Sequence, residues 1–350
     1  MTQDDKSSPP DPSPEELRSI SLAQKVSRID WTGKGPVWVL GADSERRISS
    51  FPYELLSLDL LRASLAGHRA SIEDGWIRFK DYRWARLMRK SAPDPRTSFG
   101  ELLLHKKVAR QVFYVWWTGK QFDCVQHGAG KVKPLRSALA LEKIDLKGGK
   151  IPVTFPRHAC ASRAAELILK YPGSTPETLH HLALQRILMN VMFRDLFPVD
   201  VDAVVNIQNV DGTRRHVIVE TKRKFKTRSH RYGLDKSHVW TVKTFVPLGV
   251  NYLHVICDDP NTGPDDWARY SPLNSFETES KFSKMQWLGI KLEPSHVVKD
   301  EKPLITKGMG SGSFQRGKRE QVRLPSPVPI TDAPGLFQPW NREFTSLLFS

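Results

Sequence analysis

The stretch from 199 to 224 constrains the fold of this chain more than any other. It reads VDVDAVVNIQNVDGTRRHVIVETKRK, and apolar residues alternate with polar ones on both sides of Asn209-Val210-Asp211-Gly212-Thr213. Such alternation is typical of β-strands. The Asp-Gly pair is a hairpin signal, because glycine readily adopts the left-handed conformation that tight turns require. The stretch therefore predicts two antiparallel strands joined by a short turn.

The length of the turn decides which side chains meet across the hairpin. A two-residue turn places Ala203 opposite Glu220. A three-residue turn with Gly212 left-handed pairs Asn209 with Thr213, and it places Asp202 opposite Glu220 and Asp200 opposite Lys222. We favour the second register because it sorts the side chains by polarity, whereas a slip of one residue would bury carboxylates. One face then carries Val199, Val201, Ala203, Val205, Ile207, Val217, Val219 and Thr221, and the other carries Asp200, Asp202, Asn206, Gln208, His216, Glu220 and Lys222.

Two carboxylates that face each other repel, but together they suit a hard divalent cation such as Mg²⁺. A lysine beside such a cation orients or deprotonates a water, or neutralises charge on a phosphate. Asp202, followed eighteen residues later by Glu220-Thr221-Lys222, resembles the D…(D/E)-x-K signature of the PD-(D/E)XK nuclease superfamily, in its restriction-endonuclease-like group. The resemblance covers residues 160–260. Pro198 is followed by Val199 and not by an aspartate, so Asp200 and Asp202 compete for the metal-ligand position, and we favour Asp202.

The resemblance implies an αβββαβ core and hydrolysis of DNA phosphodiester bonds, most simply by an endonuclease. Asp202, Glu220 and the backbone carbonyl of Thr221 would hold Mg²⁺, for which Mn²⁺ would substitute, and Lys222 would assist the attacking water. Candidates for a second metal are Asp200 and Glu177, which lies near the start of a helix expected from Ser174-Thr175-Pro176 to Phe197. The alternative for Glu177 is that it only caps this helix. The resemblance also allows the endonuclease subunit of a transposition, restriction or other defence complex.

The net charge of +15 favours a polyanionic partner, most simply a nucleic acid, and leaves DNA and RNA both open, although DNA is the partner that we expect. Cations are concentrated between 214 and 243, beside the motif, and a second cluster mixes them with aromatic residues between 74 and 90. These cations either contact phosphates or form a solvated surface, and the aromatic residues either stack on bases or belong to the core. The candidate nucleic-acid-binding residues are Arg214, Arg215, Arg223, Lys224, Lys226, Arg228, Arg231, Lys236, Trp76, Arg78, Lys80 and Arg83.

Composition and local pattern divide the chain into five parts within a mixed α/β fold. Residues 1–20 are predicted to be a disordered leader, 21–148 a separate α+β domain for substrate or partner recognition, and 155–298 the nuclease-like domain. A basic linker rich in Gly, Ser and Pro (299–330) and a flexible aromatic tail (331–350) follow. The elements expected around the motif are a helix over 51–67, a hairpin turning at Thr118-Gly119, a helix over 234–246 and a strand over 251–257.

The remaining expectations concern location and partners. The three cysteines, Cys124, Cys160 and Cys257, form no disulfide framework and no zinc-binding spacing, which indicates a reducing, cytoplasmic setting. No apolar run is long enough to cross a membrane. The aromatic tail either binds a protein partner, associates with itself or folds back, and a homodimer would suit cleavage of both strands. The alternative function is a catalytically inactive nuclease-fold protein that binds nucleic acid or assembles a larger complex.

Overall fold

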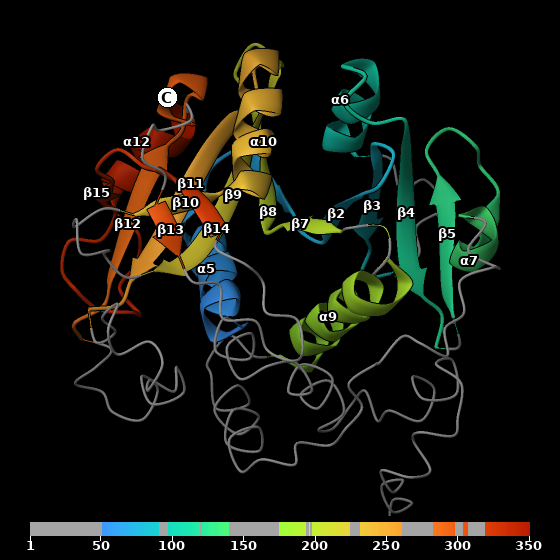
Figure 1. The fold of residues 1–350 in the computed structure, drawn as a ribbon, viewed down its shortest axis with the longest axis horizontal. Coiled ribbons are helices and arrows are strands. Elements are labelled where there is room, and N and C mark those ends of the chain that lie inside the picture. The colour runs from blue at the N-terminus through green and yellow to red at the C-terminus, as the bar shows by residue number, and fades with distance from the viewer. Residues whose placement is uncertain are drawn as a thin grey trace, which may run out of the picture.

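The computed structural model describes residues 51–90, 97–119, 121–139, 175–193, 196, 198–224, 232–260, 283–297, 304–306 and 319–350. Over these residues the fold is mixed α/β, as predicted, with two six-stranded sheets and one three-stranded sheet. Figure 1 shows the first sheet on the left and the second on the right, with β7 and β8 between them. Helices α5 and α9 lie on one side of this junction, and α6 and α10 lie on the other.

The strands of the first sheet, in spatial order, are β1 (Ala70–Glu73), β8 (Ala203–Gln208), β9 (Arg214–Lys224), β11 (Asn251–Asp258), β12 (Gln286–Lys291) and β15 (Val328–Pro329). Those of the second are β6 (Val132–Pro134), β5 (Phe122–Gln126), β4 (Gln111–Trp117), β3 (Arg83–Leu87), β2 (Trp76–Phe79) and β7 (Val199–Val201). The third consists of β10 (Gly233–Asp235), β14 (Arg319–Arg323) and β13 (Leu304–Thr306). The principal helices are α5 (Phe51–Ser64), α6 (Ser98–His105), α7 (Leu135–Ala138), α9 (Pro176–Ile187), α10 (Lys236–Phe245) and α12 (Arg342–Phe349).

The β8–β9 hairpin has the predicted register. Gln208 pairs with Arg214, and the Asn209 N–H donates to the carbonyl of Thr213 at 2.9 Å. Gly212 has a φ of +82°, the left-handed conformation that the three-residue turn needs. The prediction that Asn209 pairs with Thr213 is therefore confirmed, and the same register continued towards Asp202 brings this residue opposite Glu220.

The chain does not continue as one strand from 199 to 208, as the alternation had suggested. It bends at Asp202, so that β7 pairs with β2 in the second sheet while β8 pairs with β9 in the first. The β8–β9 ladder ends at the pair of Ala203 and Val219, and the predicted ladder pair of Asp200 with Lys222 is absent from it. The bend matters because it carries the chain between the two sheets at the candidate metal ligand.

Both faces of the hairpin are covered. The predicted apolar face, with Ala203, Val205 and Val219, packs with α5 in one core cluster. On the opposite face, Val204 and Ile218 are buried against Trp76, Phe99, Phe245 and Tyr252. Two polar residues of that face, Asn206 and His216, are also buried: the Asn206 amide donates to Glu73 at 2.7 Å, and His216 Nε2 lies 3.3 Å from the Ser98 hydroxyl.

The helix expected before the hairpin forms, but it ends earlier and packs elsewhere. The Thr175 hydroxyl caps α9 by accepting from the Thr178 N–H, and Pro176 opens the helix, as predicted. A π-helical turn, Leu188–Met192, follows α9. Leu184 and Ile187 pack on the second sheet, whereas the first sheet is covered mainly by α5, with Leu182 and Ala183 of α9 at the edge of the same core cluster. The amphipathic pattern therefore predicted a helix but not the sheet it covers.

The sheets do not divide at the boundary expected between 148 and 155. Strand β1 pairs with β8 in the first sheet, and β7 pairs with β2 in the second. Segments predicted to lie in separate domains thus share both sheets. The parts of the predicted linker that the structure describes are also ordered, because β14 pairs with β10 and β13, and β15 pairs with β12. The predicted leader, 1–20, lies outside the described residues.

The aromatic tail folds back onto the first sheet and is not a free segment. Trp340, Phe344 and Leu348 are buried in the same core cluster as α5 and the hairpin. The Trp287 indole N–H donates to the carbonyl of Leu336 at 2.8 Å. Gly289 leaves room for this segment, since a Cβ there would lie 2.8 Å from Ile330 and 2.9 Å from Leu347. The tail is therefore part of the fold.

None of the helices formed by the described residues is long and apolar enough to cross a membrane.

The packing of the tail predicts a large difference in stability between substitutions at two of its three phenylalanines. Phe344→Ala should lower the free energy of unfolding by about 3 kcal/mol or more, because it opens a cavity beneath α12. Phe337→Ala, at a side chain that is 47% exposed, is the matched control and should cost much less. Urea unfolding of both variants measures the difference. Equal small losses would show that the tail does not pack as described.

Candidate active site

Asp202, Glu220 and Lys222 come together where the chain passes from the second sheet to the first. The Thr221 N–H donates to Asp202 Oδ2 at 2.7 Å, which fixes this carboxylate against β9. Lys222 Nζ lies 3.9 Å from Asp202 Oδ2 and is in direct contact with Glu220 Oε1. The three residues of the predicted motif thus form one cluster, arranged by the bend before β8 and by the hairpin register.

Burial makes this cluster electrostatically unusual. Burial, with the charge of Glu220 as the next largest cause, raises the pKa of Asp202 well above its ordinary value. Burial also raises the pKa of Glu220 to about 7, although Lys222 opposes this change. Burial alone would lower the pKa of Lys222, but the surrounding carboxylates outweigh it and raise that pKa. The lysine is therefore held as an ammonium group between carboxyl groups that resist ionising together.

Helix α10 supplies a further contact to this cluster. His238 Nδ1 lies 3.5 Å from Glu220 Oε1 and 3.4 Å from the hydroxyl of Tyr252 on β11. Burial, and then the charges of Glu220 and Asp202, raise the pKa of Tyr252, so its hydroxyl stays protonated. His238 and Tyr252 therefore cover Glu220 on the buried side of the site.

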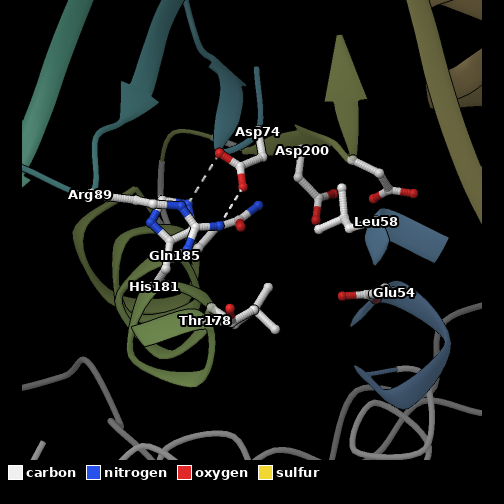
Figure 2. Close-up of a pocket in the computed structure, with 10 residues that line it drawn as sticks. Glu54, Leu58, Asp74, Arg89, Thr178, His181, Gln185 and Asp200 are labelled. Atoms are coloured by element: carbon white, nitrogen blue, oxygen red, sulfur yellow. Dashed lines mark hydrogen bonds and ion pairs between the residues drawn. The ribbon is translucent and has the colours of Figure 1, made fainter. Parts of the chain in front are cut away.

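Glu54 is a fourth acidic residue at the site, and the sequence reasoning missed it. It lies in the first turn of α5 and lines a pocket together with Asp200 and Asp202. Figure 2 shows Glu54 on the opposite side of this pocket from Asp74 and Arg89. A signal was present, because Glu54 lies on the same helical stripe as Leu58, Leu61 and Leu65, and a carboxylate within an apolar stripe requires a reason.

Arg186 of α9 neutralises part of this negative charge. Its guanidinium lies 3.1 and 3.3 Å from the two carboxylate oxygens of Glu54 and 3.7 Å from Asp200 Oδ2. Burial raises the pKa of Asp200, but Arg186 and Lys222 outweigh it, so the pKa is lower than usual. Asp200 is thus an ionised neighbour of the cluster, paired with arginine and positioned by β7.

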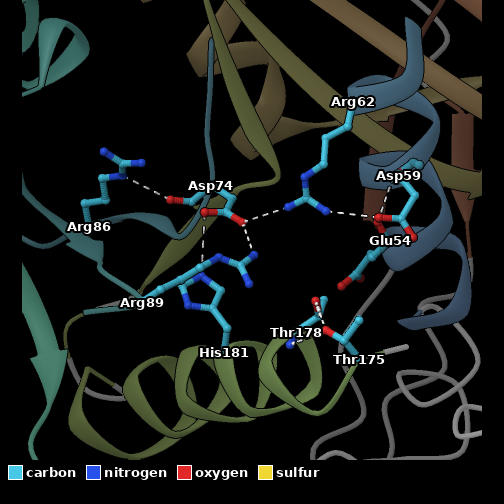
Figure 3. Close-up of polar contacts among 10 residues, drawn as sticks. Glu54, Asp59, Arg62, Asp74, Arg86, Arg89, Thr175, Thr178 and His181 are labelled. Carbon is cyan, nitrogen blue, oxygen red and sulfur yellow. Dashed lines mark hydrogen bonds and ion pairs between the residues drawn. The ribbon is translucent and has the colours of Figure 1, made fainter. Parts of the chain in front are cut away.

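A second ion-pair cluster forms the far wall of the pocket. Asp74 Oδ2 lies 2.7 Å from an Arg89 nitrogen and 3.7 Å from one of Arg62, and Asp74 Oδ1 lies 3.8 Å from His181 Nε2 (Figure 3). Burial lowers the pKa of His181 to about 4, so the imidazole is neutral near pH 7. This wall joins α5, α9 and the end of β3, and it fixes the pocket's shape.

Glu177 lies away from the pocket. It is exposed in the first turn of α9, whereas the residues of that helix that line the pocket are Thr178, His181, Leu182 and Gln185. The capping position expected of Glu177 is taken by Thr178, whose hydroxyl lies 2.8 Å from that of Thr175. The structure therefore does not bring Glu177 to the carboxylate cluster, and Glu54 lies there instead.

The predicted nucleic-acid-binding residues differ in burial and in contacts. Trp76 is fully buried, so its assignment as a base-stacking residue is wrong. Arg78 covers the ring of Trp240 at 3.7 Å, and Arg215 donates to the carbonyls of Phe349 and Ser350. Arg214 and Lys80 are exposed, and Arg83 is half-buried. The side chains of Arg223, Lys224, Lys226, Arg228, Arg231 and Lys236 lie outside the described residues.

The residue types at this site suit a divalent cation, but the side chains are not arranged around one. Within the described part of the chain, no three His, Cys, Asp or Glu side chains are grouped so that they could hold a metal ion. Asp202, Glu220, Glu54 and Asp200 nevertheless offer four carboxyl groups against two cations, Lys222 and Arg186. Carboxylate oxygens are the ligands that Mg²⁺ prefers, and a divalent cation would balance the remaining charge. Cation binding would require the Lys222 ammonium to leave Glu220.

Comparison with protein-family models, with curated proteins and with solved structures found no match for this chain.

The raised pKa of Glu220 predicts a pH-dependent change in stability. Between the ordinary value of 4.5 and about 7, the folded chain keeps a proton that the unfolded chain releases, so this group lowers the free energy of unfolding as the pH rises. Glu220→Gln has no proton to lose. Relative to the unmodified chain, this variant should gain stability between pH 5 and pH 8 in urea unfolding.

Glu177→Gln, at an exposed carboxylate outside the cluster, is the matched control for the substitution itself. A pH-independent difference for Glu220→Gln would contradict the raised pKa. Comparing variants also removes the contribution of His181, which acts in the opposite direction: its lowered pKa makes the chain less stable as the pH falls from 6.5 towards 4.

Proposed function

We propose that this chain is a divalent-cation-dependent nuclease of the PD-(D/E)XK type that hydrolyses phosphodiester bonds of DNA. The observation that carries the proposal is the contact of Lys222 with half-buried Asp202 and with buried Glu220, beside the carboxylate of Glu54. Burying so many carboxyl groups costs free energy and contributes little to packing, so their grouping indicates a role in chemistry.

The order of elements supports the proposal. Helix α5, strands β1, β8 and β9, helix α10 and strand β11 follow one another as αβββαβ when two parts are set aside: the segment between β1 and β8, and strand β10, which belongs to the third sheet. Strand β11 lies parallel to β9, joined to it through α10. This is the order that the resemblance implies, although the first helix is α5 and not the helix before Asp202.

Asp202, Glu220 and the carbonyl of Thr221 would hold Mg²⁺, with Mn²⁺ substituting. The N–H and C=O of one residue point to the same side of a strand, so the Thr221 carbonyl is directed towards Asp202, to which its N–H donates. When bound, the cation would supply a more acidic water and stabilise charge on the phosphate. Lys222 would then orient the water or neutralise the phosphate, and the net charge of +15 favours approach of DNA.

Glu54 takes the place that had been assigned to Glu177. It comes from the helix that covers the first sheet, and it lines the pocket with Asp200 and Asp202. Its carboxylate is available to a cation or a water only when Arg186 moves away, because this arginine binds both of its oxygens. Glu54 and Asp200 are therefore our candidates for a second cation.

Substitutions at the cluster should remove cleavage and leave the fold intact. Asp202→Asn, Glu220→Gln and Lys222→Met should each reduce cleavage of plasmid DNA in Mg²⁺ or Mn²⁺ by ~100-fold or more, since each removes a ligand or the group that assists the water. EDTA should abolish cleavage. Linear and plasmid substrates compared side by side separate exonuclease from endonuclease activity. Full activity of Glu220→Gln would refute the assignment.

Glu54→Gln and Glu177→Gln form a matched pair for the helix glutamate. The first should reduce cleavage by ~10-fold or more, because it removes a carboxylate from the pocket, and the second should have no effect. Circular dichroism verifies that both variants fold. Equal activities would exclude Glu54 from the reaction.

The second candidate function is nucleic-acid binding without cleavage. The contact of the Lys222 ammonium with both carboxylates favours it, because this contact satisfies the pair without a metal. Salt-sensitive binding with no cleavage in any divalent cation would select this function. The resemblance also allows a subunit of a transposition or defence complex, but the aromatic tail packs on the chain itself and gives no support for a protein partner.

A further inference from the structure

Tyr82 is exposed at an unusual place in the second sheet. It lies in the turn between β2 and β3, and its side chain is 64% exposed. The other three rings between 74 and 90, those of Trp76, Phe79 and Trp84, are buried. Among the aromatic residues of this stretch, Tyr82 alone has an exposed ring.

The backbone around Tyr82 is held in a conformation that side chains disfavour. Asp81 has a φ of +64° and Tyr82 one of +56°, and bulky residues rarely adopt such values. The third non-glycine residue with a positive φ among those described is Lys107, at +56°. The Arg110 N–H donates to the carbonyl of Tyr82 at 2.7 Å, so the turn after α6 lies beside the turn after β2. All three strained residues thus belong to two adjacent turns.

Strain of this kind persists where a residue is needed for something other than stability, because glycine would adopt the same backbone at lower cost. The side chains of these turns are mostly cationic. Lys80, Lys106, Lys107 and Arg110 are exposed, and Arg83 is half-buried and 3.5 Å from Asp81. An exposed ring among cations combines a surface that stacks on bases with charges that bind phosphates.

We propose that the Tyr82 tip, formed by residues 80–83 and 106–110, binds an unpaired stretch of nucleic acid, with one base stacked on the Tyr82 ring. The strand's phosphates lie against Lys80, Lys106, Lys107 and Arg110. A base offers its face to a ring only where it is not stacked between neighbours, so the site prefers single strands to duplex. This inference rests on the proposed function for the identity of the partner, and it adds a surface outside the carboxylate pocket.

The test measures binding of the full chain to a fluorescent single-stranded DNA oligonucleotide and to a blunt duplex of the same sequence, in EDTA so that no cleavage occurs. Tyr82→Ala should weaken binding of the single strand by about 10-fold and leave duplex binding unchanged. Tyr82→Phe should retain the affinity, because the ring stacks without its hydroxyl. Val210→Ala, at the exposed tip of the β8–β9 hairpin, is the control and should have no effect.

Tyr82→Gly separates function from stability. Glycine relieves the positive φ, so the variant should be at least as resistant to urea as the unmodified chain, and yet it should lose single-strand affinity like Tyr82→Ala. Lys107→Gln and Arg110→Gln should each make the affinity less dependent on salt, by about one unit of the log–log slope.

Unchanged single-strand affinity of Tyr82→Ala, or equal losses for single strand and duplex, would overturn the proposal. The result is independent of the nuclease assignment, since binding in EDTA requires no catalysis. If the chain cleaves DNA in a metal-dependent way but its single-strand affinity does not depend on Tyr82, the proposed function stands. The proposal that the Tyr82 tip binds a single strand is then refuted. Single-stranded RNA of the same sequence shows whether the tip distinguishes the sugar.

Discussion

A cluster of buried and half-buried carboxyl groups, which outnumber the cations beside them, is the interaction on which this structure depends. Asp202, Glu220, Glu54 and Asp200 approach one another from β9, α5 and the β7–β8 bend, with Lys222 and Arg186 between them. Such a cluster destabilises a fold unless protons or a cation complete it. The packing around it is correspondingly extensive, since both faces of the hairpin are buried and α9 and α10 each contribute to the site. Burial of apolar side chains on the two faces of the hairpin therefore offsets the free-energy cost of the carboxylate cluster.

The sequence predicted the local parts of this arrangement well. Alternation and the Asp-Gly turn were sufficient for the hairpin and its register, because strand period and turn geometry are local properties. The same holds for the cap at Thr175 and for the grouping of Asp202, Glu220 and Lys222, which follows from the register. Each of these features could be predicted because it is determined by residues close together in the sequence.

The sequence failed where contacts join distant segments. The pairing of β1 with β8 and the burial of the tail beneath the first sheet depend on surface complementarity, which leaves no local period. Glu54 was missed because it precedes Asp202 by more than a hundred residues, and Glu177 was preferred because it stood next to the motif. Trp76 was assigned to a surface because cations and aromatic rings are mixed in this stretch, but both faces of β2 are covered: Trp76 and Ile77, on opposite faces, are fully buried.

The first sheet combines strands and helices from distant parts of the chain, and this has a consequence for synthesis. Helix α5 and strand β1 emerge from the ribosome early, but β8 and β9 follow much later and α12 last. Pairings between such distant segments form slowly, because the entropy of closing a long loop is lost before their contacts stabilise the fold. The carboxylates of α5 and β9 therefore meet only after most of the chain has been made. A nascent chain therefore carries no assembled site until β9 has been made.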